Sequence, residues 1–224
     1  MSLHEPDAPV LQRYTAFLRI NHWIAAACFI MLTLSGLAMF SPALFWLSAL
    51  FGGGQPTRAI HPWIGVVLFV SYALLCVRFL GSNLPNRDDV AWSRRIVDVI
   101  NNRDENLPEL GKYNPGQKLV FWSQTLLIPV LLVTGLVIWD WYFYGYTTIQ
   151  TKRVAVLVHS LAAILAITVI IVHIYAGIWV KGTMRAMTRG TVTAGWAYRH
   201  HRKWFRQSLA GQPPTAEPPR AGGD

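Results

Sequence analysis

Four long stretches without a charged residue constrain this chain more than any other feature of its sequence. Asp, Glu, Lys and Arg are absent from residues 20–57, 59–77, 119–139 and 154–180. About 20 helical residues cross the hydrocarbon core of a bilayer, where only helices or closed barrels satisfy every backbone hydrogen bond. The sequence therefore predicts four membrane-spanning helices, near residues 22–40, 60–78, 119–139 and 154–180.

The composition agrees with this interpretation. Hydrophobic residues make up 53% of the chain and charged residues 14%, whereas a soluble domain has about 25% charged residues. We expect an all-α membrane protein with a four-transmembrane-helix bundle in residues 1–206. No internal repeat or second soluble domain is evident. Residues 207–224 are expected to be a disordered C-terminal tail, because Pro, Gly and Ala dominate their end.

The basic residues predict the orientation of the bundle. Of the 20 Lys and Arg residues, 17 fall in the two terminal segments and the loop between spans two and three. Such residues collect on the cytoplasmic side of a membrane. We therefore place both termini and the middle loop on the cytoplasmic side of a bacterial inner membrane. Membrane lipids with anionic headgroups account for the net charge of +9, so no nucleic-acid partner is expected.

The segments between the spans also carry signals. The apolar residues of Asp88–Asn102 have the spacing of an amphipathic helix at the membrane interface, within the middle cytoplasmic loop. The segment Ser41–Gln55 is an apolar loop on the membrane surface or under a partner. Pro62 is expected in the first turn of the second span, where proline is tolerated. Asn114 before Pro115 predicts an N-cap at the start of the third span.

Seven histidines are present, and four of them lie at or within the spans. His4, His200 and His201 lie in polar terminal segments, and we expect them to be exposed to solvent. Ionisable residues inside membrane spans are rare and usually mark a function. Taken singly, each such histidine is still more often a hydrogen-bonded structural residue than a ligand. The four are His22, His61, His159 and His173.

The arrangement of these four histidines favours a role as ligands over a purely structural role. His159 and His173 are separated by nearly four helical turns, so they share one face of the fourth span about 21 Å apart. Because alternate spans run in opposite directions, His22 matches the depth of His173 near the inner surface. His61 matches the depth of His159 near the outer surface. The sequence thus predicts two histidine pairs at two levels of the bilayer.

A haem is the metal group that best suits two histidines alone. Zinc normally takes four protein ligands, and non-haem iron adds a carboxylate that no span provides. A haem supplies four nitrogens and leaves two axial positions for neutral imidazoles. No Cys-x-x-Cys-His motif occurs, so two non-covalent haem b groups are expected. Four glycines in the spans admit a flat macrocycle or, equally, close helix packing: Gly36, Gly65, Gly135 and Gly177.

The role expected for such a protein is electron transfer. Iron with both axial positions filled cannot bind oxygen or a substrate directly. Two such centres at two depths form a path for electrons from one membrane face to the other.

Three stretches carry a specific resemblance to a known family. They are Arg58–Gly65 with its His-Pro pair, Gly111–Lys118 with the sequence Gly-Lys-Tyr-Asn-Pro-Gly-Gln-Lys, and His159–Gly182. Together they resemble the gamma subunit, the cytochrome b subunit, of membrane-bound formate dehydrogenase. The resemblance covers about residues 13–206. The four-helix di-haem pattern alone is shared with cytochrome b subunits of hydrogenases and thiosulfate reductases.

The resemblance implies specific roles for residues of this chain. His61 and His159 would ligate the iron of the outer haem, and His22 and His173 that of the inner haem. A quinone site for menaquinone or ubiquinone would lie beside His173. Its other residues would be Asn114, Gly116 and Gln117.

The resemblance also implies partners. Electrons would come from an iron–sulfur (beta) subunit, and formate would be oxidised on a molybdenum or tungsten catalytic (alpha) subunit. The chain itself would then pass electrons to membrane quinone, as the quinone-reducing subunit of the complex. Other functions remain open from the residues alone. They are the cytochrome b subunit of a hydrogenase or related oxidoreductase, a histidine-relay transporter or proton channel, and a membrane anchor without haem.

Overall fold

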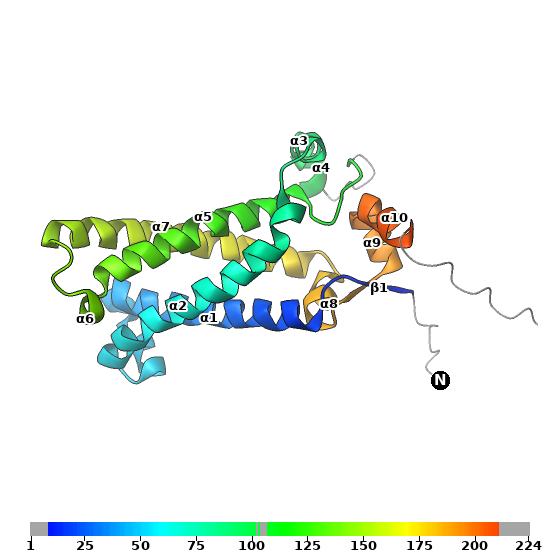
Figure 1. The fold of residues 1–224 in the computed structure, drawn as a ribbon. Coiled ribbons are helices and arrows are strands. Elements are labelled where there is room, and N and C mark those ends of the chain that lie inside the picture. The colour runs from blue at the N-terminus through cyan, green and yellow to red at the C-terminus, as the bar shows by residue number, and fades with distance from the viewer. Residues whose placement is uncertain (1–8, 102, 104–106, 211–224) are drawn as a thin grey trace, which may run out of the picture.

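Four long helices dominate the structure, which is a computed structural model describing residues 9–101, 103 and 107–210 (Figure 1). Each contains an apolar stretch long enough to cross a membrane, and no other helix in those residues does. The prediction of an all-α, multi-pass membrane protein is therefore confirmed. The four helices are α1 (Ala16–Phe40), α2 (Gly54–Phe79), α5 (Pro115–Ile138) and α7 (Ile149–Trp179).

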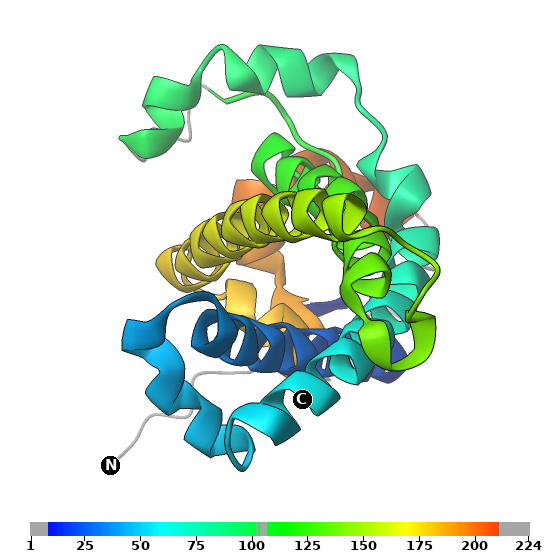
Figure 2. The same cartoon turned by 90° about the vertical axis from the view of Figure 1, so that its left-hand side faces the viewer.

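The long helices form two antiparallel pairs. α1 packs along α2, α5 packs along α7, and the pairs meet mainly through α2 and α5. Figure 2 looks along the bundle and shows the helices in a ring in the order α1, α2, α5, α7. The connections within the two pairs lie at the same end of the bundle (Figure 1). They contain the 3-10 helix η1 (Pro42–Phe51) and the short helix α6 (Asp140–Phe143).

The start of α2 corrects one expectation. Pro62 lies inside α2, two turns after its beginning at Gly54, and not in the first turn. The segment before it is not a loop, because η1 fills most of it. Gly52 and Gly53 have positive φ angles of 87° and 103°, which glycine adopts without steric cost. These two residues turn the chain, so α2 begins earlier than the charge pattern suggested.

The middle segment contains two short helices where one was expected. α3 (Arg87–Ser93) is closed at its start by a capping box between Asn86 and Asp89, and α4 (Ile96–Ile100) follows. Arg95 lies between them outside helical geometry, with φ −110° and ψ 27°. Trp92 is buried, whereas Val97 and Ile100 are exposed. The placement of this segment at the membrane interface stays a prediction.

A buried ion pair fixes the middle segment to the bundle. The Lys118 Nζ atom of α5 lies 2.8 Å from an Asp89 carboxylate oxygen and donates to the Leu84 carbonyl at 3.0 Å. Trp122 of the same helix donates to the Asn83 carbonyl at 2.9 Å, in the 3-10 helix η2 (Leu80–Asn83). The start of α5 is therefore held from one side by the segment that precedes it.

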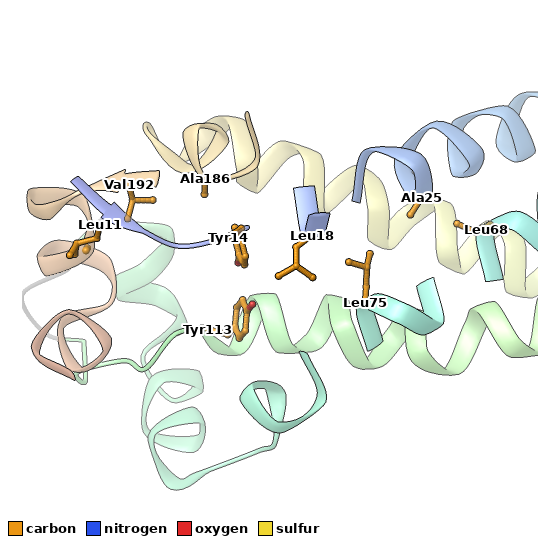
Figure 3. Close-up of a cluster of buried hydrophobic side chains, with 10 residues drawn as sticks. Leu11, Tyr14, Leu18, Ala25, Leu68, Leu75, Tyr113, Ala186 and Val192 are labelled. Carbon is orange, nitrogen blue, oxygen red and sulfur yellow. The ribbon is translucent and has the colours of Figure 1, made fainter. Parts of the chain in front are cut away.

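The two ends of the described chain meet beside the start of α5. Strands β1 (Val10–Gln12) and β2 (Thr191–Thr193) pair antiparallel, with Leu11 opposite Val192. Figure 3 shows Leu11, Val192, Tyr14 and Tyr113 in one buried hydrophobic cluster. The remaining elements of this end are α8 (Thr183–Thr188), α9 (Ala194–His200) and α10 (Arg202–Ala210).

Residues 207–210, expected in the disordered tail, belong to α10. The rest of that tail, residues 211–224, lies outside the described residues, as does His4.

His201 is buried, which contradicts the expectation that it is exposed to solvent; His200 beside it is partly buried. Only 1% of His201 and 5% of Arg13 are exposed. The His201 Nδ1 atom lies 2.8 Å from the Gly111 carbonyl oxygen, and Arg13 Nη2 lies 3.4 Å from His201 Nε2. Because a carbonyl and a guanidinium face its two nitrogens, the ring is neutral with its proton on Nδ1.

Arg13 is the centre of this group. Its guanidinium lies 4.7 Å from the ring centre of Trp204 and 5.1 Å from that of Trp196, distances typical of cation–π contacts. It also donates to the Lys112 carbonyl. We call these five residues the terminal cluster: Arg13, Lys112, Trp196, His201 and Trp204. Through Gly111 and Lys112 it holds the segment that leads into α5.

The terminal cluster should loosen in acid. Burial, and then repulsion by Arg13, lowers the pKa of His201 from 6.5 to about 3. The folded cluster thus binds fewer protons than the open one between these values, so its stability is complete above pH 6.5 and decreases as the pH falls toward 3. Hydrogen exchange of residues 107–114 and 194–205, corrected for intrinsic rates, should accelerate between pH 7.5 and pH 5. His201→Gln, which keeps a donor and an acceptor without titrating, should remove that acceleration. Equal acceleration in both proteins would contradict the assignment.

Candidate functional site

The structure brings the four span histidines together in two pairs. The outer pair is His61 of α2 and His159 of α7, and the inner pair is His22 of α1 and His173 of α7. In both pairs the ring centres are 6.4 Å apart, with interplanar angles of 61° and 54°. This is the pairing that the helix directions predicted. Their role as ligands stays a prediction.

The separation within each pair suits one metal ion between two imidazoles. A metal–imidazole bond is about 2 Å long, so two rings on opposite sides of one ion have centres roughly 6 Å apart. No group of three or more His, Cys, Asp or Glu able to hold a metal occurs among the described residues. Zinc or non-haem iron would thus lack ligands at either pair. A haem brings four nitrogens of its own and fits a site with two histidines.

Each histidine of the outer pair contacts a hydroxyl group on the neighbouring helix. Ser35 Oγ of α1 lies 2.7 Å from His61 Nδ1. Thr134 Oγ1 of α5 lies 2.9 Å from His159 Nδ1. In both helix pairs, a hydroxyl group of one helix therefore contacts the Nδ1 atom of a histidine on the other helix.

A glycine follows each of these hydroxyl residues and borders the same ring. A Cβ atom on Gly36 would lie 3.5 Å from His61 Cε1, and one on Gly135 would lie 3.5 Å from His159 Cε1. The added Cβ atoms of the other two glycines noted in the sequence, Gly65 and Gly177, would not approach a histidine. A side chain longer than that of alanine at Gly36 or Gly135 would therefore meet the imidazole ring.

A short sequence match underlies this arrangement. Residues 32–37 and 131–136 share the pattern Leu-x-x-Ser/Thr-Gly-Leu. A match of six residues is too short to be recognised as a repeat. Only the fold shows that the Ser or Thr of each segment lies beside a histidine. The sequence analysis did not identify Ser35 and Thr134 for this reason.

The inner pair has different surroundings. His22 Nδ1 is buried without a hydrogen-bond partner among the described residues, and no hydrogen bond of the His173 ring is found there. More than a third of His173 is exposed. The Trp23 ring meets that of His22 edge to face, with centres 5.5 Å apart. The inner imidazoles therefore lack the hydroxyl contacts of the outer ones.

The polar residues at the start of α5 form a capping box. Asn114 Oδ1 accepts from the Gln117 backbone N–H at 2.8 Å, and Gln117 Oε1 accepts from the Asn114 N–H at 3.0 Å. This confirms Asn114 as the N-cap and Pro115 as the first helical residue. The side-chain NH₂ groups of Asn114 and Gln117 have no hydrogen bond within the described part of the chain. A Cβ atom on Gly116 would lie 3.3 Å from Asn114 Oδ1 and 4.0 Å from Trp92.

Comparisons with known proteins agree on one family. The family model described as prokaryotic cytochrome b561 matches residues 13–190. The chain is 46% identical over 195 residues to the formate dehydrogenase cytochrome b556(fdo) subunit of Escherichia coli K12, covering 87% of this chain and 92% of the relative. The nitrate-inducible b556(Fdn) subunit of the same strain is 41% identical over 189 residues, covering 84% and 87%. The formate dehydrogenase cytochrome b556 subunit of Haemophilus influenzae is 38% identical over 197 residues, covering 88% and 83%.

Substitutions at Gly36 and Gly135 test whether the outer pair holds a group of fixed size. Alanine adds a Cβ at an ordinary contact distance of 3.5 Å, so Gly36→Ala and Gly135→Ala should keep full haem content. Leucine adds a further carbon about 1.5 Å beyond Cβ, so Gly36→Leu and Gly135→Leu should displace the ring and remove one haem per chain. Haem quantitation of the purified protein measures this. Leucine is a better helix former than glycine, so loss of helix stability would not explain the result. Full haem content in both leucine variants would contradict the site.

Proposed function

The chain belongs to the prokaryotic cytochrome b561 family, and we propose that it is the membrane cytochrome b subunit of a formate dehydrogenase complex. The observation that carries this proposal is the pair of bis-histidine sites at two depths of a four-helix apolar bundle. The names of relatives up to 46% identical over most of the chain support the complex in which it acts.

Four histidines would hold two haem b groups. His61 and His159 would be the axial ligands of the outer haem, and His22 and His173 those of the inner haem. Each haem, when bound, supplies a one-electron redox centre. With two imidazoles bound to each iron, the chain's own residues would keep substrates away from the metal. The apolar helices around them exclude water, so the protein fixes and insulates the electron path.

Membrane quinone, either menaquinone or ubiquinone, would accept the electrons beside His173. The NH₂ groups of Asn114 and Gln117 suit donation to a quinone carbonyl oxygen, and Gly116 leaves room for the Asn114 side chain, whose Oδ1 would lie 3.3 Å from an added Cβ. The capping box uses the amide oxygens of the same two side chains. Capping and quinone binding therefore do not compete for the same atoms.

The partners would be an iron–sulfur (beta) subunit and a molybdenum or tungsten catalytic (alpha) subunit that oxidises formate. The protein would lie in the bacterial inner membrane with both termini cytoplasmic, as the basic residues indicate. The meeting of β1 and β2 at one end of the bundle agrees with termini on the same side. A cytochrome b subunit of a hydrogenase is the alternative. The subunits that co-purify with the chain distinguish the two.

Loss of a ligand should separate haem binding from formate oxidation. His61→Ala and His159→Ala should each lower the content from two haems per chain to one and abolish formate-driven quinone reduction. Formate oxidation with an artificial acceptor should persist, because in this proposal formate is oxidised on the alpha subunit. Haem quantitation and the two assays on the purified complex measure this. His200→Ala removes a histidine outside the spans and serves as control. Two haems in both span variants would refute the ligand assignment.

Substitutions at the start of α5 can separate capping from quinone binding. Asp is as good an N-cap as Asn, and Glu serves in a capping box as Gln does. Asn114→Asp and Gln117→Glu therefore keep the capping oxygens, replace each NH₂ donor by an acceptor oxygen and add one negative charge. Both variants should keep two haems and raise the KM for quinone roughly tenfold, the effect of losing a hydrogen bond worth about 1.4 kcal/mol.

The capping box of α3 provides the matched control. Asn86→Asp makes the same change at the N-cap of that helix and should leave the KM unchanged. A quinone KM that stays at the native value in both α5 variants would place the quinone elsewhere.

A further inference from the structure

We propose that Ser35 and Thr134 are positioning residues that fix the outer imidazoles and lower the reduction potential of the outer iron below that of the inner one. The inference rests on the proposed function, since it takes His61 and His159 as haem ligands. It adds a direction, because electrons then move spontaneously from the outer to the inner centre.

The hydrogen-bond pattern favours one tautomer for both rings. A hydroxyl group has a single hydrogen, and that of Ser35 is donated to the Met31 carbonyl at 2.7 Å. Its oxygen therefore accepts from His61 Nδ1–H, so the lone pair of the ring is on Nε2. Thr134 donates in the same way to the Val130 carbonyl at 2.6 Å and accepts from His159. Both rings thus present Nε2 as the metal-binding atom.

Burial makes this contact effective. Ser35 is fully buried, with 0% of its surface exposed, and hydrogen bonds are electrostatically stronger in such low-dielectric surroundings. Gly36 and Gly135 border the same rings at Cε1. Each ring therefore has a hydroxyl at Nδ1, and a glycine keeps the space beside its Cε1 free of a longer side chain.

A hydrogen bond from Nδ1–H makes an imidazole a more basic ligand. A more basic ligand stabilises ferric iron relative to ferrous iron and so lowers the potential. The outer pair has two such bonds. His22 Nδ1 is buried without a partner among the described residues, so the inner imidazoles are the weaker donors. The inner iron should therefore have the higher potential.

Helix packing alone does not account for these hydroxyls. Thr33 of α1 and Thr168 of α7 also donate to the carbonyl four residues earlier, each at 2.9 Å. Neither contacts a histidine in the described structure. The bond to the preceding turn is thus common in these helices, and the added contact with a ring distinguishes Ser35 and Thr134. Two different helix pairs make that contact independently.

The test is a spectroscopic redox titration of the purified complex containing both haems. Ser35→Ala and Thr134→Val, the second nearly isosteric, remove the hydroxyls. Each should shift one of the two haem midpoint potentials upward, and the double variant should shift it further. The other potential should stay in place. The potential that is missing in His61→Ala identifies the outer haem.

Two matched variants separate positioning from packing. Thr134→Ser keeps the hydroxyl but loses the methyl group, and should restore the native potential. Thr33→Val makes the same hydroxyl-to-methyl change on α1 without a histidine contact, and should shift neither potential.

Several results would overturn the inference. Unchanged potentials in Thr134→Val with both haems bound would do so, as would an upward shift confined to the inner haem. If Ser35→Ala fails to assemble, the pair Thr134→Val and Thr134→Ser decides alone. Two haems in His61→Ala would instead show that the ligand assignment of the proposed function is wrong.

Discussion

The absence of water from a bilayer core is the constraint on which this structure depends, because every polar atom there needs a partner within the protein. Asn21 and Ser71 satisfy this requirement for each other. The Asn21 side-chain NH₂ donates to the Ser71 carbonyl at 2.9 Å, and the Ser71 hydroxyl donates to the Asn21 side-chain oxygen at 2.6 Å. The span histidines do not satisfy this requirement by hydrogen bonds with one another. Hydroxyl groups lie within hydrogen-bond distance of one nitrogen of each outer ring. In both pairs the ring centres are 6.4 Å apart, a separation that fits one iron ion between two imidazoles.

The bundle is held together differently along its length. In the spans, two tightly packed helix pairs meet mainly through α2 and α5, which suits a bundle that receives flat groups between its helices. At the end where β1 and β2 pair, a hydrophobic cluster and the cation–π contacts of Arg13 join the termini to the segment before α5. Lys118 and Asp89 hold the start of α5 from the other side. The residues proposed to bind quinone therefore begin a helix whose first turn is fixed by contacts on two sides.

The sequence predicted what depends on local or periodic patterns. Charge-free stretches gave the four spans, helical spacing gave the histidine pairs, and Asn-Pro gave the start of α5. The burial of His201 could not be predicted, because its partners Gly111 and Arg13 lie 90 and 188 residues away. Ser35 and Thr134 resemble any small polar residue of a membrane helix until the fold places a ring beside them. The start of α2 was misjudged because Gly52 and Gly53 turn the chain within an uncharged stretch, where charge carries no information.

α7 has a special place in this arrangement, since it contributes one histidine to each pair. It runs through 31 residues without an internal proline, so its backbone hydrogen bonds continue unbroken between His159 and His173. The spacing of the two histidine pairs along the bundle is therefore set by one continuous helix and not by the packing of loops. α2 differs, because Pro62 follows His61 directly and removes one backbone hydrogen bond there. The two helices of the outer pair therefore differ in the backbone hydrogen bonds beside their histidines. In the proposed function, the rate of electron transfer between the two haems would depend on their separation, and α7 alone would set that separation.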